Sequence, residues 1–158
     1  MGLEEKASGF IEKVKEDPLQ VVKYLASYGG ATALSYAIGA ASAYHSQEQG
    51  CNPESIATLS FTAKTATFYL ANIAIYTASY WNEYQTGARH WRKDMDEAIL
   101  SNMGGTGVTL AGGGLHWALM RTINLSPISS FIFGNLIPGV SAALVKVIRD
   151  AKKGILVR

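Results

Sequence analysis

The chain has 158 residues and a formal net charge of +2. Charged residues make up 16% of it, below the roughly 25% of an average soluble domain, while apolar residues reach 48%. So small a charge gives no reason to expect a nucleic-acid partner, and the single Cys51 excludes an internal disulfide. No Cys or His spacing is typical of a metal site, so we expect no cofactor.

Four segments almost free of charge predict four membrane-spanning helices. Residues 24–47, 98–120 and 122–145 contain no Asp, Glu, Lys or Arg, and residues 55–82 contain only Lys64. About 20 predominantly apolar residues suffice for a helix to cross roughly 30 Å of hydrocarbon. The alternative is a soluble bundle with an Ala/Gly-rich core, in which these four segments would have no solvated side.

In chain order, residues 1–18 carry apolar side chains at helical spacing among charges, which predicts an N-terminal helix in the membrane interface. A second interfacial helix is expected within residues 85–101, where Trp91, Met95 and Ile99 share a face. The fold class is thus an all-α, integral membrane four-helix bundle in one domain, residues 1–158, with a cytoplasmic tail at 147–158. The expected spans are residues 19–44, 54–82, 102–120 and 127–146.

The positions of Lys and Arg predict the orientation. These residues cluster before the first span, at 89–93 between the second and third, and after the fourth, whereas the segment 45–54 has none. Because positive residues stay on the cytoplasmic side, we expect a multi-pass protein of the cell membrane with both termini in the cytoplasm.

A shift of 75 residues places one half of the chain on the other. Leu25, Gly29, Gly30 and Gly39 fall on Leu100, Gly104, Gly105 and Gly114, and after one deletion Pro53 and Ser55 fall on Pro127 and Ser129. This pattern predicts a tandem repeat of two helical hairpins.

Glycines within the spans are expected to let helix backbones approach closely, as small residues do in membranes. The alternative is that they open a groove for a lipid chain or a substrate. The glycines predicted to serve helix packing are Gly29, Gly30, Gly39, Gly104, Gly105, Gly112 and Gly113.

Lys64 is the one charge well inside a span, and a lysine facing lipid at that depth would cost about 2.5–3.5 kcal/mol. It either faces the bundle interior, as a receptor for an anionic group such as a lipid phosphate, or extends to the outer interface. Asn72 shares its helix face, and Arg121 and His116 lie in or beside the third span; these three are further candidates for phosphate binding. The alternatives to phosphate binding are that His116 serves helix packing and that Arg121 only extends to the membrane surface. No span contains a carboxylate, which argues against proton-coupled export and membrane hydrolysis, so we expect no enzyme.

The segment Lys23-Tyr24-Leu25-Ala26-Ser27-Tyr28-Gly29-Gly30 resembles the basic and aromatic start and glycine pair of the first helix in the GtrA-like family of small membrane proteins. The resemblance implies that the protein assists translocation or docking of a polyprenyl-phosphate-linked sugar. It implies membrane lipids as partners, together with a membrane glycosyltransferase. The alternative partners are other membrane subunits or a second copy of the chain. The alternatives are a non-catalytic structural or assembly subunit of a larger membrane complex, or a small channel.

Overall fold

The computed structural model describes residues 18–103 and 106–152, which form helices joined by short turns, with no strand among them. The prediction of an all-α fold is therefore confirmed. The predicted N-terminal interfacial helix lies outside the described residues except for Pro18. Residues 153–158 of the predicted tail also lie outside them.

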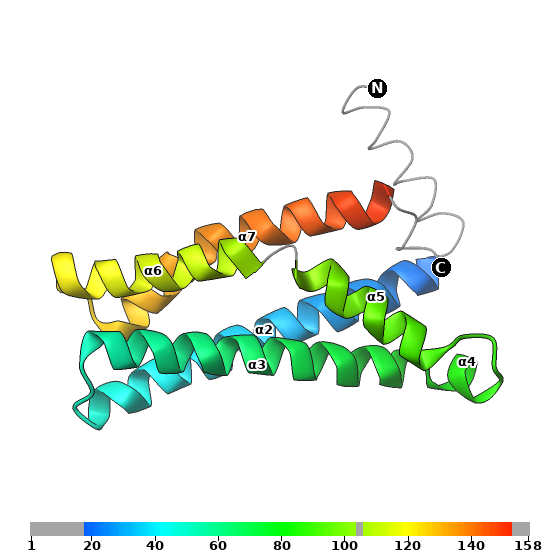
Figure 1. Ribbon diagram of the computed structural model, residues 1–158, viewed down its shortest axis with the longest axis horizontal. Coiled ribbons are helices and arrows are strands. Elements are labelled where there is room, and N and C mark those ends of the chain that lie inside the picture. The colour runs from blue at the N-terminus through cyan, green and yellow to red at the C-terminus, as the bar shows by residue number, and fades with distance from the viewer. Residues whose placement is uncertain (1–17, 104–105, 153–158) are drawn as a thin grey trace.

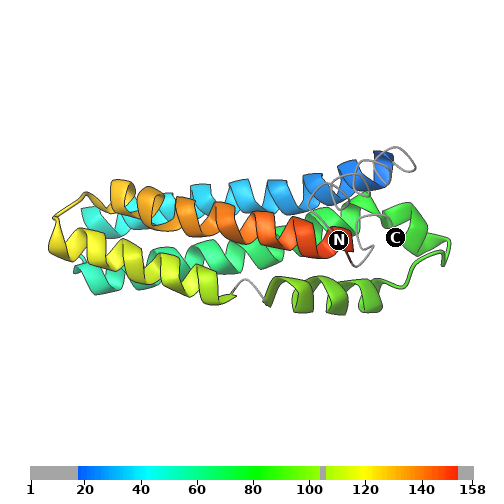
Figure 2. The same cartoon turned by 90° about the horizontal axis from the view of Figure 1, so that it is seen from above.

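Two long helical hairpins make up the bundle (Figure 1). The first consists of α2 (Pro18–Glu48) and α3 (Pro53–Ser79), and the second of α6 (Thr106–Thr122) and α7 (Pro127–Lys152). A short helix, α4 (Trp81–Gln85), and then α5 (Trp91–Met103) connect the hairpins. Seen from above, α5 and α6 follow one another along one side of the bundle (Figure 2). The predicted third span, 102–120, therefore overlaps the end of α5 as well as α6.

The two hairpin turns start their second helices by similar local chemistry. Asn52 caps α3, because its Oδ1 accepts a hydrogen bond of 2.8 Å from the backbone N–H of Ser55. Ser126 precedes α7, and its Oγ accepts a hydrogen bond of 3.3 Å from the N–H of Ser129. A proline follows in both turns, at the first helical position, where its missing N–H is not needed. The 75-residue shift, after its one deletion, aligns the same two turns, with Pro53 on Pro127 and Ser55 on Ser129.

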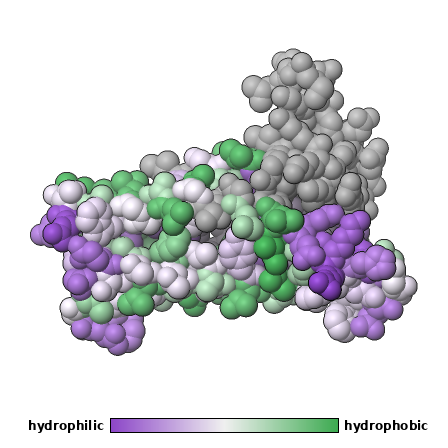
Figure 3. Space-filling view, viewed as in Figure 1, coloured by the Kyte–Doolittle hydropathy of each residue, from purple (hydrophilic) through white to green (hydrophobic). Residues whose placement is uncertain are grey.

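Many of the buried side chains of the bundle are polar or small, and many large apolar side chains lie on its outside. Buried polar residues are Ser27, Ser35, Ser46, Ser60, Lys64, Asn72, His116, Ser130 and Asn135. Exposed aliphatic residues include Leu25, Leu34, Ile38, Leu59, Leu70, Leu110, Ile132, Leu144 and Val145. On the face that Figure 3 shows, hydrophilic residues gather at the two ends. Buried polar residues together with so many exposed large apolar residues are unusual for a protein surrounded by water.

Among the described residues, one helical segment, Pro127–Lys146, is long and apolar enough by length and composition to cross a membrane. Of the other long helices, α2 and α3 contain many Ser, Thr and Tyr residues, and α6 has only 17 residues. The compact apolar cluster of the bundle is small and contains Ala43, Ile56, Ala57, Met120 and Phe131.

Glycines stand where helices approach most closely, but not all of the predicted ones do. A Cβ added at Gly39 would collide with the Phe131 ring and come within 2.9 Å of the Lys64 Cβ. Added at Gly112 it would stand 3.2 Å from the carbonyl oxygen of Gly134. Contacts at 3.1 Å from Phe61 and 3.3 Å from Ile75 would arise at Gly113 and Gly30, respectively.

Gly29 differs from the other predicted packing residues. It lies on the exposed side of α2, where an added Cβ would meet nothing within 4 Å, so in this fold it serves no contact between helices. Gly104 and Gly105 lie outside the described residues. Gly134, which the sequence analysis did not single out, makes the closest approach to a neighbouring backbone among these glycines, because a Cβ there would stand 2.6 Å from the backbone nitrogen of His116.

Candidate functional site

Lys64 points into the bundle, where three helices surround its side chain. The side chain is 7% exposed, and its Nζ donates a hydrogen bond to Asn135 Oδ1 on α7. It also stands 4.9 Å from the centre of the Tyr36 ring on α2, within the range of a cation–π contact. Of the two alternatives for Lys64, the structure therefore has the interior one.

Asn135 is fixed by bonds of its own, so it holds the lysine in a defined position. Its Nδ2 donates to the carbonyl oxygen of Phe131 at 2.9 Å. Its backbone carbonyl accepts a bond of 2.6 Å from the Tyr36 hydroxyl. Gly139 makes this approach possible, because a Cβ there would occupy the position of the hydroxyl. The buried ammonium is thereby tied to both hairpins.

A cavity of about 250 Å³ extends from Lys64 between α2, α3, α5, α6 and α7. The aromatic side chains in its lining are Tyr28, Tyr36, Phe61, Phe68 and Tyr69. Lys146 also lines it and stands 5.1 Å from the centre of the Tyr28 ring. Lys146 follows Asn135 on α7 by eleven residues, or about 16 Å of helix. The cavity thus has a positive charge at each end and aromatic walls between them.

Two polar atoms that lack partners also belong to residues of this lining. Thr65 Oγ1 and Asn102 Oδ1 are buried, and neither has a hydrogen-bond partner among the described residues. Burying such a group without a partner costs about 1–3 kcal/mol. An amide oxygen only accepts, and a hydroxyl both donates and accepts. The lining therefore suits a molecule that carries hydroxyl groups as well as a negative charge.

The other candidate residues lie apart from Lys64. Asn72 accepts a hydrogen bond of 3.5 Å from Asn102 Nδ2, so it touches the cavity only through that side chain. His116 is fully buried, packs edge-on against Phe131 at 5.5 Å between ring centres, and does not line the cavity. Neither of its ring nitrogens has a hydrogen-bond partner among the described residues.

Arg121 does not share a site with Lys64. Its Nη1 forms an exposed ion pair of 2.7 Å with Glu54 at the start of α3. Glu54 precedes Lys64 by ten residues, which corresponds to about 15 Å of helix. The two cations therefore cannot bind one phosphate group together.

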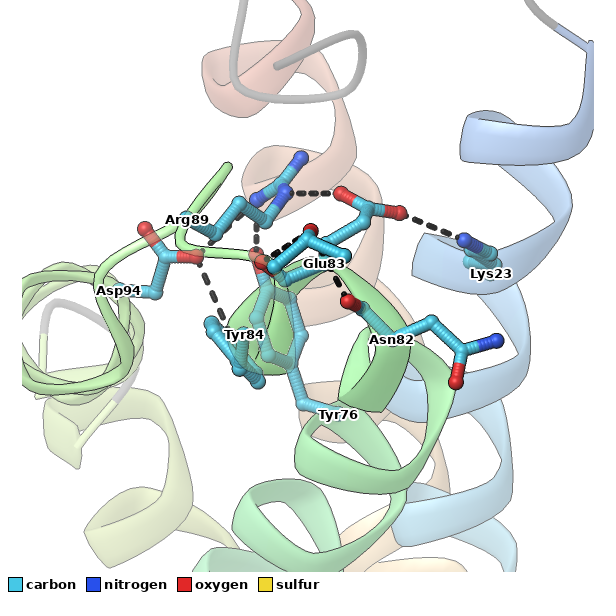
Figure 4. Close-up of polar contacts among 8 residues, drawn as sticks. Lys23, Tyr76, Asn82, Glu83, Tyr84, Arg89 and Asp94 are labelled. Atoms are coloured by element: carbon cyan, nitrogen blue, oxygen red, sulfur yellow. Dashed lines mark hydrogen bonds and ion pairs between the residues drawn. The ribbon is translucent and has the colours of Figure 1, made fainter.

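An ion network ties the helices together at the opposite end from Arg121 (Figure 4). Glu83 accepts from Lys23 Nζ on α2 at 2.8 Å and from Arg89 Nε at 2.6 Å. Arg89 also donates to Asp94 on α5 at 3.1 Å, and Asp94 accepts from the Tyr84 hydroxyl at the same distance. The network joins the first hairpin to α4 and α5.

The charges of this network are mutually stabilised. Burial raises the pKa of Glu83, but hydrogen bonds from Lys23 and Arg89 outweigh it and hold that pKa below its ordinary value. Burial lowers the pKa of Arg89, and the bonds to Asp94 and Glu83 more than reverse that shift. Because its charges are paired with one another, the network stabilises the contacts between these helices and is not a candidate binding site.

Cavity residues that the sequence analysis did not single out include Tyr36, Thr65, Asn102 and Lys146. Tyr36 lies within one expected span and Lys146 at the end of another, and only the arrangement of α2, α3 and α7 brings both into the lining of one cavity. Asn102 and Asn135 are the kind of polar residue that marks a helix contact in a membrane, and this pattern was the available indication.

The arrangement can bind an anion and hold hydroxyl groups. Among the described residues, no carboxylate lines the cavity, and no group of three or more His, Cys, Asp or Glu side chains could hold a metal ion. Comparison of the chain with protein-family models, curated proteins and solved structures finds no match.

Proposed function

We propose that the chain is a multi-pass membrane protein in which α2, α3, α6 with the end of α5, and α7 cross the bilayer. The exposed aliphatic side chains along the bundle support this, because contact with hydrocarbon costs such side chains nothing whereas contact with water does. The interior of the same bundle contains Lys64, Asn72, His116 and Asn135. This fits a membrane protein, because polar side chains of membrane helices face the bundle interior rather than hydrocarbon, which cannot form hydrogen bonds with them.

The lengths of the helices fit a bilayer. On α2, the 21 residues from Lys23 in the ion network to the exposed Tyr44 correspond to about 32 Å. On α3, the 23 residues from Glu54 to Thr77 correspond to about 35 Å, and Thr77 accepts from the exposed Trp91. Both values are close to the roughly 30 Å of a hydrocarbon core flanked by aromatic residues.

The function that the site supports best is binding of the phosphorylated, hydroxyl-bearing headgroup of a lipid. The observation that carries this proposal is Lys64, an ammonium group buried at the end of a cavity in which Thr65 and Asn102 have polar atoms without partners. The phosphate would contact Lys64, and the hydroxyl groups would satisfy Thr65 and Asn102. A cavity of about 250 Å³ lies below the roughly 300–1,000 Å³ that holds a drug-sized molecule, so the lipid chain stays outside, in the bilayer.

A polyprenyl-phosphate-linked sugar has this chemistry, and the resemblance to the GtrA-like family favours it. The protein would dock such a lipid or assist its translocation, without catalysing a reaction. The second candidate, a structural subunit, is favoured by one observation. Gly29, Ala33, Ala37 and Ala41 form an exposed line of small residues on α2, the kind of face that packs against another membrane helix.

We expect Lys64→Met to weaken headgroup binding by about tenfold or more, because a hydrogen bond to a charged group contributes about 1.5–3 kcal/mol. Binding is measured by native mass spectrometry of the full chain in detergent, with a polyprenyl phosphate carrying one hexose as the probe. The same polyprenyl phosphate without the sugar should bind more weakly, because Thr65 and Asn102 then remain unsatisfied.

Arg92→Met is the matched control, since it removes an exposed positive charge that does not line the cavity. It should leave the affinity for both probes unchanged. Equal binding of the sugar-bearing probe by the parent chain and by Lys64→Met would contradict the proposal. Equal binding of the two probes by the parent chain would contradict the role given to the hydroxyl groups.

The native Cys51 tests the orientation, because it is the only thiol and lies in the turn between α2 and α3. We expect a membrane-impermeant maleimide to label it in intact cells. A chain with Cys51→Ser and Ala88→Cys carries its thiol in the exposed turn between α4 and α5 and should be labelled only after lysis. The reverse pattern would show that the termini face outward.

A further inference from the structure

A second depression lies on the outside of the bundle, between α3 and α6, and shares only Phe61 with the lining of the Lys64 cavity. It has a volume of about 320 Å³. Ala57 on α3 and Gly113 and Gly114 on α6 form the small-residue part of its lining. Phe61, Leu110 and Trp117 provide the large apolar side chains. α6 lies beside α3 here, with no other described helix in the lining (Figure 1).

Charge is confined to one end of this groove. Glu54 lies at the start of α3, and Arg121 lies one turn beyond Trp117 on α6. Glu54 Oε1 accepts from Arg121 Nη1 at 2.7 Å and from Trp117 Nε1 at 3.3 Å. The Arg121 and Glu54 side chains are 59% and 50% exposed, so both remain accessible to a ligand. The groove thus presents an accessible positive and negative group at its end and an apolar trough behind them.

We propose that this groove binds a zwitterionic aminophospholipid of the phosphatidylethanolamine type, a site that depends on the membrane location proposed above. The headgroup has a phosphate for Arg121 and an ammonium for Glu54, and one acyl chain lies along Gly113 and Gly114. A purely anionic phospholipid would gain the arginine contact and meet repulsion from Glu54. The charge pair therefore selects a headgroup that carries both signs, and an ethanolamine ammonium can donate hydrogen bonds to the Glu54 carboxylate whereas the quaternary ammonium of phosphatidylcholine cannot.

Trp117 provides a direct readout, because it lines the groove. The full chain with Trp81→Phe and Trp91→Phe keeps Trp117 as its only tryptophan. Reconstituted into phosphatidylcholine vesicles, this chain is titrated with brominated phosphatidylethanolamine or brominated phosphatidylglycerol, whose bromines quench a nearby indole. We expect phosphatidylethanolamine to quench about threefold more effectively at equal mole fraction, the size of an exposed ion-pair effect.

In the same single-tryptophan background, Glu54→Gln should abolish the preference. Glu48→Gln is the control, because it removes an exposed carboxylate that does not line the groove, and it should retain the preference. Equal quenching by the two lipids in the parent chain, or a preference that survives Glu54→Gln, would overturn the proposal. Absence of quenching by either lipid in a chain that has inserted would also overturn it, and would show that protein covers the groove.

Failure of this proposal can be told apart from failure of the proposed function. A chain that does not insert into vesicles contradicts the membrane location itself. Lys64→Met in the single-tryptophan background should leave the lipid preference of Trp117 unchanged, because Lys64 does not line this groove. Loss of headgroup binding at Lys64 and loss of the Trp117 preference are thus separate outcomes.

Discussion

Replacing Gly134 with alanine is expected to destabilise the bundle by about 3 kcal/mol, the upper part of the range for overpacking. The added Cβ would stand 2.6 Å from the backbone nitrogen of His116 and 2.8 Å from its Cα. A backbone cannot rotate away as a side chain can, so α6 and α7 must separate. The measurement is the free energy of unfolding of the full chain in micelles, from a denaturing-detergent titration followed by circular dichroism.

Gly114→Ala is the matched control on α6. A Cβ there meets nothing within 4 Å, so only helix propensity changes, and alanine should stabilise the helix by up to about 1 kcal/mol. The two glycine substitutions should thus have effects of opposite sign. Equal effects at both positions would mean that α6 and α7 do not approach at Gly134, and the second hairpin would have to be packed differently.

The helices could be predicted from the sequence because charge marks their limits. α3 begins at Pro53 and α7 at Pro127, within one residue of the expected starts, because a proline stands at the start of each nearly uncharged segment. The third helix could not be placed as well. Residues 98–120 contain no charge, and this pattern does not show that one helix, α5, ends at Met103 and another, α6, begins at Thr106.

The candidate site was predictable in part. A lone lysine in an uncharged segment has to avoid hydrocarbon, and that physical argument identified Lys64 without any knowledge of its neighbours. Its partner Asn135 lies 71 residues away, and only the crossing of α3 with α7 brings them together. Arg121 has the same charge, but composition does not reveal that Glu54 already pairs with it. The close packing at Gly134 could not be predicted either, because the sequence pattern does not tell which glycines of a helix face a neighbouring backbone.

Replacing Asn135 with leucine is expected to destabilise the chain by about 3–5 kcal/mol, because Lys64 would then be a buried charge without its hydrogen-bond partner. Lys64→Met alone should have a smaller effect, about 1–3 kcal/mol, since it leaves only the neutral amide oxygen of Asn135 unsatisfied. The free energies of unfolding of both variants are measured by the same titration in micelles.

The chain with both Lys64→Met and Asn135→Leu should be more stable than Asn135→Leu alone, because replacing both members of a buried polar pair by apolar groups of similar size is close to neutral. Additive effects would instead mean that Lys64 is held by something other than Asn135. The double variant also separates stability from binding. It should be folded and yet bind the hexose-bearing polyprenyl phosphate about tenfold or more weakly than the parent chain, because the cavity has lost the positive charge of Lys64 and a stable fold does not restore it.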